Sequence, residues 1–303
     1  MGSNTFNLLI AEVGGNGEYK PLYRSKIAVK LGEGGFSKNY ITEEAMQRAF
    51  VALEAQISRI KAEYCDRIHA FATSATRNAT NADEFLHKIK ELFGLKVQVI
   101  SGEKEALMVY KGVSLSGALG KDTSLIMDIG GGSTEFVIAN KEEVLWAKSY
   151  ELGVSRLWEK FNPSDPLSKE EETKLDNFLH EEVHELIEQT QKHKVTHLVG
   201  SSGSFDTFCD VISERVGNYE EVFEKSSLPF DMDALKALLN EIINSTLKER
   251  ELMPHMPEYR VRMIVISALF VRMVLRHTGI ASASISRYSL KEGVLFDVLH
   301  GKL

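Results

Sequence analysis

A turn of consecutive glycines interrupts segment 124–140, SLIMDIGGGSTEFVIAN, between runs of apolar residues. Glycine weakens a strand, so a cluster of glycines at this point needs a local reason. Successive backbone N–H groups in such a turn form a concave site for anions, and glycine lets phosphate oxygens approach the chain closely. The sequence therefore predicts a phosphate-binding turn. Its members are Gly130, Gly131, Gly132 and Ser133, of which the serine adds a hydroxyl donor.

Asp128 stands directly before this turn. Mg²⁺ in phosphate sites is usually held by one or two carboxylates together with retained waters and the substrate. Asp128 is therefore the predicted metal ligand, and Mg²⁺ is the predicted cofactor. The alternative interpretation is a tight hairpin between buried strands, although such hairpins usually have a two-residue turn such as Asn-Gly.

Segment 101–106, SGEKEA, opens a predicted helix with acids in its first turn. A carboxylate that lies near a bound phosphate without binding the metal can orient and deprotonate an attacking water. The same acids are also typical of an ordinary helix start, where they complement the helix dipole and Ser101 acts as the cap. This segment alone does not choose between the two interpretations.

Two further segments combine small polar residues with possible phosphate contacts. Arg77 follows a strand among small hydroxylated residues and can pair with phosphate in a fork geometry, or it is a surface arginine in a loop. Segment 200–205, GSSGSF, lies between a strand and a helix. It can receive a nucleotide or distal phosphates on a helix N-terminus, or it serves close strand–helix packing. Its candidate residues are Gly200, Ser201, Ser202 and Gly203.

Segment 180–184, HEEVH, matches the HExxH pattern of zinc proteases. Its neighbours supply an apolar stripe at helical spacing, and the histidines stand in a strongly charged run. We therefore interpret the segment as a solvated helix without zinc.

Composition limits the class of protein. A chain of 303 residues with 43% hydrophobic and 26% charged residues indicates a globular protein, most naturally of two domains. A net charge of −7 argues against a nucleic-acid partner. No apolar run reaches the roughly 20 residues of a membrane span, and the N-terminus lacks signal-peptide order, so we expect a cytoplasmic protein with no membrane partner. Cys65 and Cys209 form no CxxC pair, so neither a disulfide framework nor a thiolate zinc site is indicated.

Periodicity predicts the elements that must position these residues. Strands are expected over 6–13, 18–30, 68–73, 96–100, 124–129, directly after the glycine turn, and over 197–200 and 281–286. Helices are expected over 42–63 with Thr42 as N-cap, from about 81, and over 102–113, 169–192, 231–249, 258–276 and 290–300. This alternation is the signature of an α/β fold.

We place the domain boundary after a Gly/Ser-containing connection, which gives domains 1–120 and 121–303. The C-terminal helix, 290–303, is a candidate to pack on the first domain. A short internal echo supports the division, because GSNTF at 2–6 and GSTEF at 132–136 both precede an apolar strand. The echo makes Ser3 and Asn4 candidate phosphate ligands.

Motifs along nearly the whole chain resemble the exopolyphosphatase and guanosine pentaphosphate phosphohydrolase family, Ppx/GppA. In chain order they are ATSATRNATN at 72–81, ISGEKEA at 100–106, DIGGGSTEFVI at 128–138, ELGVSRL at 151–157, GSSGSF at 200–205 and LKEGVLFDVL at 290–299. The resemblance implies two actin-like α/β domains, of the ribonuclease H-like type found in sugar kinases, Hsp70 and actin, around a central cleft. It also implies Mg²⁺-dependent removal of the terminal phosphate from polyphosphate or pppGpp.

The same resemblance implies roles by position. Glu105 matches the catalytic glutamate and Asp128 the metal-linked aspartate. Glu135 matches an acid beside the phosphate turn, and Arg77 an arginine that faces the phosphate. The glycine turn itself matches the family's phosphate loop.

Some segments depart from the family pattern. Members begin with a full strand ending in Asp before Gly-Ser-Asn-Thr, whereas this sequence starts at Met1. Either the start is assigned too far downstream or the sequence is natively short. In the second case we expect a weaker metal-side carboxylate set and an exposed sheet edge. Arg262 and Arg287 replace usual acids, which predicts either a cleft more attractive to anions or an altered choice of substrate. Longer relatives carry C-terminal helical domains, one of them HD-like, that this chain lacks. We therefore expect short polyphosphates or nucleoside polyphosphates to be better substrates than long polymers.

The leading hypothesis is a phosphoanhydride hydrolase, an exopolyphosphatase or pppGpp 5′-phosphohydrolase of the stringent response. One rival is a kinase on the same fold, and another is a non-catalytic sensor that binds polyphosphate or guanosine polyphosphates, since fold alone does not fix activity. The sequence leaves open the choice between polyphosphate and pppGpp, the chain-length preference, and whether the protein is a homodimer.

Overall fold

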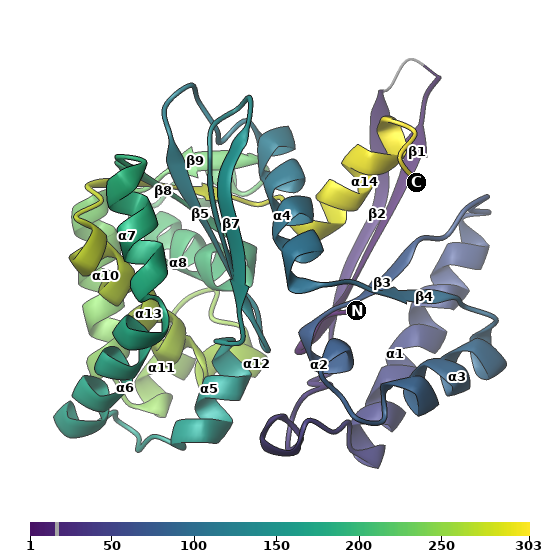
Figure 1. Cartoon of the computed structure of the whole chain (residues 1–303), viewed down its shortest axis with the longest axis horizontal. Coiled ribbons are helices and arrows are strands. Elements are labelled where there is room, and N and C mark those ends of the chain that lie inside the picture. The colour runs from purple at the N-terminus through teal and green to yellow at the C-terminus, as the bar shows by residue number, and fades with distance from the viewer. Residues whose placement is uncertain (16–17) are drawn as a thin grey trace.

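The strands of the second half of the chain form one mixed sheet in the order β7-β6-β5-β8-β10-β9 (Figure 1). The structure is a computed structural model that describes residues 1–15 and 18–303. The antiparallel part comprises β5 (Ser124–Ile129), β6 (Thr134–Ala139) and β7 (Val144–Tyr150). The parallel part adds β8 (His197–Ser201) and β10 (Ser282–Ser286), and β9 (Ser227–Pro229) pairs antiparallel with β10. The predicted α/β class is confirmed.

Alternation along β5 and β6 sends side chains to two buried faces, which explains why both strands are apolar almost throughout. Leu125, Met127 and Ile129 join the larger core with the helices α8 (Ser202–Arg215), α10 (Met232–Asn244) and α13 (Ile264–Thr278). The opposite face carries Ile126 and Val137, and α4 (Gly102–Ser116) packs on it. Residues of β5 and β6 that alternate with those of the larger core, as Ile126 and Val137 do, therefore face α4.

The first half of the chain is built around a separate apolar cluster that includes Phe6, Phe50 and Phe85. An antiparallel ribbon of β1 (Thr5–Val13) and β2 (Tyr19–Ala28) stands beside the parallel pair β3 (Ala70–Ala72) and β4 (Val97–Val99). Helices α1 (Glu43–Ala62) and α3 (Ala82–Phe93) complete this part. The predicted N-cap is confirmed, because the Thr42 hydroxyl accepts a hydrogen bond of 3.2 Å from the Ala45 amide.

Helix α4 crosses the C-terminal helix α14 (Leu290–Leu299) at very short range. A Cβ atom on Gly112 would lie 1.9 Å from the Ser289 carbonyl oxygen, and one on Gly293 would lie 1.8 Å from that of Met108. Glycine at both positions is therefore required for the two backbones to touch. Since α14 also contacts β1, the end of the chain lies against elements of the first half. The domain boundary at 120/121 itself stays a prediction.

Several predicted helices were too long. The segment 169–192 divides at Val183 into α6 (Lys169–Glu182) and α7 (His184–Lys192). The segment 231–249 divides into α10 and α11 (Leu247–Glu251), because Thr246 and Glu249 form a capping box that starts a new helix. The segment 258–276 likewise divides into α12 (Glu258–Val261) and α13. The remaining elements are η1 (Phe36–Lys38), α2 (Ser74–Arg77), α5 (Val154–Phe161) and α9 (Tyr219–Val222).

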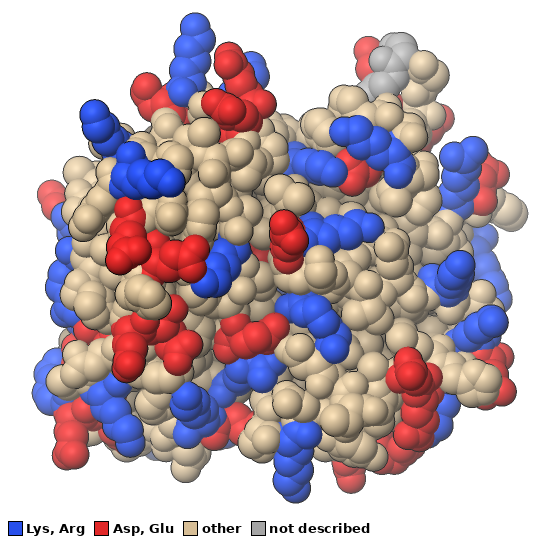
Figure 2. Space-filling view, in the orientation of Figure 1, with Lys and Arg blue, Asp and Glu red and all other residues tan. Residues whose placement is uncertain are grey.

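None of the helices within residues 1–15 and 18–303 has the length and apolar character to cross a bilayer. Acidic and basic side chains intermingle on the face shown in Figure 2. The functional site must therefore be sought in local geometry.

Candidate active site

A cavity of about 200 Å³ lies where the two halves of the chain meet. The N-terminal turn, the glycine turn and the start of α8 contribute to its walls, as do segments 259–264 and 287–291. Residues predicted as site residues that line it are Ser3, Asn4, Glu105, Asp128, Gly130, Gly131, Gly132, Ser133, Glu135, Ser202 and Gly203. The structure thus brings together residues that are far apart in the sequence.

The glycine turn is the hairpin between β5 and β6, closed by a hydrogen bond of 3.0 Å from the Gly130 amide to the Ser133 carbonyl. The alternative interpretation as a hairpin is therefore confirmed for the backbone, and the same hairpin lines the cavity. Amides at the start of α5 donate to the carbonyls of Gly130 and Gly131, so those carbonyls are engaged away from the cavity. Within the described chain, the amides of Gly131, Gly132 and Ser133 have no acceptor. Consecutive unpaired N–H groups in a turn are the donors from which anion-binding nests are built.

The glycines also allow the N-terminal turn, which contains Ser3 and Asn4, to lie directly against the glycine turn. A Cβ atom on Gly131 would lie 2.5 Å from Cγ of Asn4, and one on Gly132 would lie 2.5 Å from Oγ of Ser3. The Ser3 hydroxyl accepts from the Ala75 amide at 3.0 Å, and the Asn4 carboxamide accepts from the Ser155 hydroxyl at 2.6 Å. Both predicted ligands therefore lie at the cavity with side chains that already have protein partners.

Asp128 and Glu135 are cross-strand partners on β5 and β6, on the face that α4 covers. The register continues this polar row, pairing Glu135 with Ser149 and Asp128 with Ser201. The serine hydroxyls donate to the carboxylates, Ser149 to Glu135 at 2.7 Å and Ser201 to Asp128 at 3.3 Å. Like charges directly opposite in a sheet are destabilising. Burial raises the pKa of both carboxyls, and the charges of Glu105 and Asp128 raise that of Glu135 further.

Glu105 projects from the first turn of α4 toward the same face. The Ser101 hydroxyl caps this helix by accepting from the Lys104 amide at 3.1 Å, so the alternative structural interpretation of segment 101–106 also holds. Burial raises the pKa of Glu105 to about 7, although its ion pair with Arg77 opposes the rise. A carboxyl with a pKa near neutral is suited to accept a proton from water at physiological pH.

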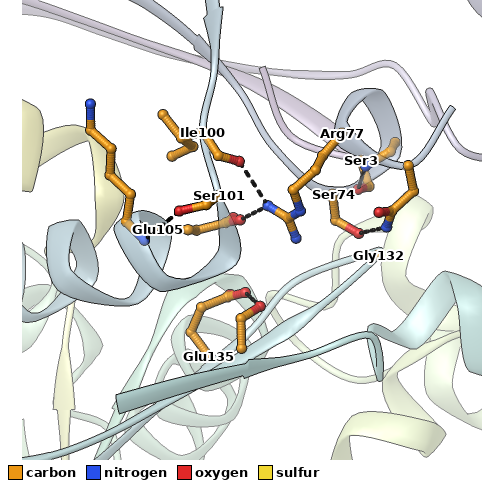
Figure 3. A network of polar contacts seen from close by, with 12 residues as sticks. Ser3, Ser74, Arg77, Ile100, Ser101, Glu105, Gly132 and Glu135 are labelled. Atoms are coloured by element: carbon orange, nitrogen blue, oxygen red, sulfur yellow. Dashed lines mark hydrogen bonds and ion pairs between the residues drawn. The ribbon is translucent and has the colours of Figure 1, made fainter. Parts of the chain in front are cut away.

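Arg77, which was predicted to face the phosphate, is absent from the residues that line the cavity. It lies beside Glu105, and its guanidinium points at the Glu105 carboxylate (Figure 3). Its Nη1 donates to Oε2 of Glu105 at 2.9 Å and to the Ile100 carbonyl at 3.2 Å. Its Nη2 donates to Glu151 at 3.0 Å, and the other oxygen of Glu151 accepts from Arg156. Glu151 and Arg156 were not among the predicted site residues, because nothing in the local pattern of ELGVSRL shows that they contact Arg77.

The donor set fits Mg²⁺ held jointly with a phosphate. Within residues 1–15 and 18–303 no three His, Cys, Asp or Glu side chains are grouped as a ready-made metal site. Mg²⁺ does not need one, because it binds through one or two carboxylates and takes its other ligands from phosphate and water. Asp128 and Glu135 supply adjacent buried carboxylates whose mutual repulsion a cation would relieve.

The turn 200–203 divides between core and cavity. A Cβ atom on Gly200 would lie 2.0 Å from the Phe205 ring, so this glycine serves strand–helix packing. Ser201 is fully buried beside Asp128. Ser202 has a φ of +67° and lines the cavity, as does Gly203, over which the Arg260 guanidinium lies.

The arginines that replace usual acids do not supply uncompensated charge to the cavity. Arg287 pairs with Asp210 at 2.8 Å, and Arg262 lies over the Trp158 ring, outside the cavity lining. The basic side chains of the cavity that form no ion pair in the described part of the chain are Lys26 and Arg260, the latter donating to the Thr207 hydroxyl at 2.9 Å. Neither residue was predicted, since isolated basic residues carry no motif.

The HEEVH segment does not present its histidines as a pair. The break at Val183 separates His180 on α6 from His184 on α7. His180 packs against His277 at a ring distance of 4.1 Å, and Nδ1 of His184 lies 2.9 Å from the Glu181 carbonyl. The interpretation of this segment as a helix surface agrees with this geometry.

Comparison with known proteins gives consistent matches. A sequence profile of the Ppx/GppA phosphatase family matches residues 9–302. A guanosine-5′-triphosphate,3′-diphosphate pyrophosphatase from Photobacterium profundum is 32% identical over 213 residues, which cover 70% of this chain but 42% of that protein. The crystal structure of an exopolyphosphatase from Cytophaga hutchinsonii superposes with a TM-score of 0.96 at 34% identity, covering 99% of this chain and 96% of that one. An Aquifex aeolicus member, at 24% identity and a TM-score of 0.80 over 100% of this chain and 96% of that one, shares the fold.

Proposed function

The chain belongs to the Ppx/GppA phosphatase family, and we propose that it hydrolyses phosphoanhydrides, releasing the terminal phosphate of inorganic polyphosphate or pppGpp. The observation that carries the proposal is the pairing of a nest of unpaired amides at Gly131, Gly132 and Ser133 with a buried carboxyl, Glu105, in one cavity. A nest binds the phosphate, and the carboxyl supplies the base for an attacking water.

The terminal phosphate binds in the glycine turn, where backbone amides donate to its oxygens. Because these donors are fixed by the β5–β6 hairpin and by packing against the N-terminal turn, they need no reorganisation as charge develops on the phosphate. Asp128, with Glu135 beside it, would hold Mg²⁺, which would neutralise charge on the phosphate oxygens.

Glu105 accepts the proton of the attacking water. Arg77 contacts its Oε2, and Oε1 has no hydrogen-bond partner in the described chain, so Oε1 is the oxygen that would accept from water. A pKa of about 7 keeps a large fraction of the carboxylate ionised at neutral pH while leaving it basic enough to take the proton.

Lys26 and Arg260 extend positive charge beyond the nest. Neither side chain forms an ion pair in the described part of the chain, and both line the same cavity. They are placed to bind phosphates next to the terminal one, through charge-assisted hydrogen bonds. A cavity of about 200 Å³ with this short run of cations favours short polyphosphates or a nucleoside polyphosphate.

Phosphate release from short polyphosphate, long polyphosphate and pppGpp tests the proposal, measured in parallel with Mg²⁺ and with EDTA. Glu105→Gln should lower turnover by about 10²- to 10⁴-fold with little change in substrate binding. Glu103→Gln, two residues away and exposed, is the matched control and should retain activity. Binding without release would indicate a sensor, and release that requires an acceptor would indicate a kinase. Either result, or full turnover by Glu105→Gln, would reject the proposal.

A further inference from the structure

We propose that Glu151 is a positioning residue for hydrolysis, one that fixes the Glu105 carboxylate through Arg77 and joins it to the glycine turn through Arg156. This inference rests on the proposed function, since it concerns the base assigned there. Glu151 follows β7 directly and lies in the loop that leads to α5.

Both carboxylate oxygens of Glu151 are engaged. Oε1 accepts from Nη2 of Arg77 at 3.0 Å, and Oε2 accepts from the Ser74 hydroxyl and from Nη2 of Arg156, each at 2.7 Å. Ser74 and Arg77 belong to α2, whereas Arg156 belongs to α5. One carboxylate therefore ties an element of the first half of the chain to an element of the second.

Arg77 connects Glu151 to Glu105, so its position sets the orientation of the Glu105 carboxylate. A guanidinium is planar and rigid, so fixing one arm fixes the direction of the other. With Nη2 held by Glu151, Nη1 points at Oε2 of Glu105 at 2.9 Å and at the Ile100 carbonyl at 3.2 Å. Loss of the anchor would free the guanidinium to rotate, and the Glu105 carboxylate would lose its fixed partner.

Arg156 extends the connection to the phosphate site. Its Nε donates to the Gly132 carbonyl at 2.9 Å, and its guanidinium lies 4.7 Å from the centre of the Phe36 ring. The chain of contacts thus runs from Gly132 through Arg156, Glu151 and Arg77 to Glu105. Because small misplacements of reacting groups cost large factors in rate, this connection has a kinetic consequence.

Exposure separates this role from a structural one. The Glu151 side chain is 43% exposed, although its partners Arg77 and Arg156 are only 17% and 18% exposed. Glutamine keeps the shape of the side chain and an oxygen that accepts from its partners, so the substitution removes one half-exposed charge at little cost in stability. We therefore expect Glu151→Gln to fold normally, with a Tm within about 2 °C of wild type. A loss of activity without a loss of stability would point to positioning.

The test compares Glu151→Gln with Glu185→Gln. Glu185 is similarly exposed at 36% and also binds a basic residue, Lys148 of β7, at 2.5 Å, but lies away from the cavity. Glu151→Gln should lower kcat by about 10- to 100-fold. Its KM should stay within about threefold of wild type, because the terminal phosphate keeps its nest. Glu185→Gln should leave both parameters unchanged.

A double-mutant cycle with Arg77→Met asks whether Glu151 acts through Arg77. If it does, adding Glu151→Gln to Arg77→Met should lower kcat by less than about twofold further. Effects that multiply, or an unchanged kcat in Glu151→Gln, would overturn the inference. Wild-type release that Glu105→Gln abolishes would leave the proposed function intact in that case.

A structural readout covers the case in which the wild type releases no phosphate. In a crystal structure of Glu151→Gln we expect the Nη1–Oε2 contact between Arg77 and Glu105, 2.9 Å in the native chain, to be lost. Retention of that contact would overturn the inference regardless of activity.

Discussion

Replacing Glu105 with Gln should inactivate the protein and at the same time stabilise it at neutral pH. Burial raises the pKa of this carboxyl from its ordinary 4.5 to about 7, even against the favourable ion pair with Arg77. The ionised form is therefore less favourable in the folded protein than in the unfolded chain. Glutamine resembles the protonated form, so the substitution removes this cost together with the base.

The magnitude follows from proton linkage. Below pH 4.5 the carboxyl is protonated in both states and the cost is absent. As the pH rises toward 7, the unfolded chain loses this proton first, so the wild type loses stability. Above about pH 7 the loss levels off at about 3 kcal/mol, since each pKa unit corresponds to about 1.4 kcal/mol. For a chain of 303 residues this amounts to about 5 °C in Tm.

Thermal unfolding of both proteins at pH 5 and pH 8 measures the effect. Glu105→Gln should melt about 5 °C above wild type at pH 8 and about 1 °C above it at pH 5. Glu103→Gln is the control. It removes an exposed acid from the same first turn, and it should lose rather than gain stability, by about 0.3 to 1 kcal/mol. An equal or lower Tm for Glu105→Gln at pH 8 would refute the reasoning, because the ion pair with Arg77 would then outweigh burial.

Three further predictions concern activity. Hydrolysis should rise with pH and level off above about pH 7 as Glu105 loses its proton, and a pH–rate profile without this limb would exclude Glu105 as the base. Gly132→Ala should lower activity by at least about 100-fold, because the new Cβ would lie 2.5 Å from Ser3 Oγ and displace the turn, whereas Gly120→Ala, with open space around it, should be harmless. Arg260→Met should raise KM by about tenfold with kcat nearly unchanged, the cost of a charge-assisted contact to phosphate, and an unchanged KM would remove Arg260 from binding.

Local sequence signals predicted the elements that depend on local physics. The strands on either side of the glycine turn agree with the prediction because both of their faces are buried, which makes them apolar throughout. The helix N-caps Thr42 and Ser101 could also be predicted, because each hydroxyl accepts a hydrogen bond from the amide three residues ahead. The helix break at Val183 could not be predicted from the sequence, since the apolar stripe continues across it. The Thr246–Glu249 capping box is visible in the sequence, but the apolar periodicity of 231–249 favoured one continuous helix.

The site was predictable to the extent that its residues stand in motifs. Asp128 and the glycine turn follow from chemistry alone, and Glu105 required the resemblance to a family. Glu151 and Arg156 could not be predicted, because they join the candidate site only through tertiary contacts. The spacing of residues along the chain does not predict that α2 contacts the loop after β7.

The electrostatics of the cavity argue for a ligand that carries both signs of charge. Asp128 and Glu135 are neighbours on one face of adjacent strands, and Glu105 lies nearby. Burial and mutual repulsion therefore disfavour the ionised forms of these carboxyls. The neighbouring amides of the glycine turn have no acceptor in the described chain, so they favour an anion. A bare cation would satisfy only the acids, and a bare phosphate would satisfy only the amides while adding to the repulsion. A phosphate that arrives with Mg²⁺ satisfies both, which is why we propose the metal-bound polyphosphate, rather than either component alone, as the ligand for which this cavity is built.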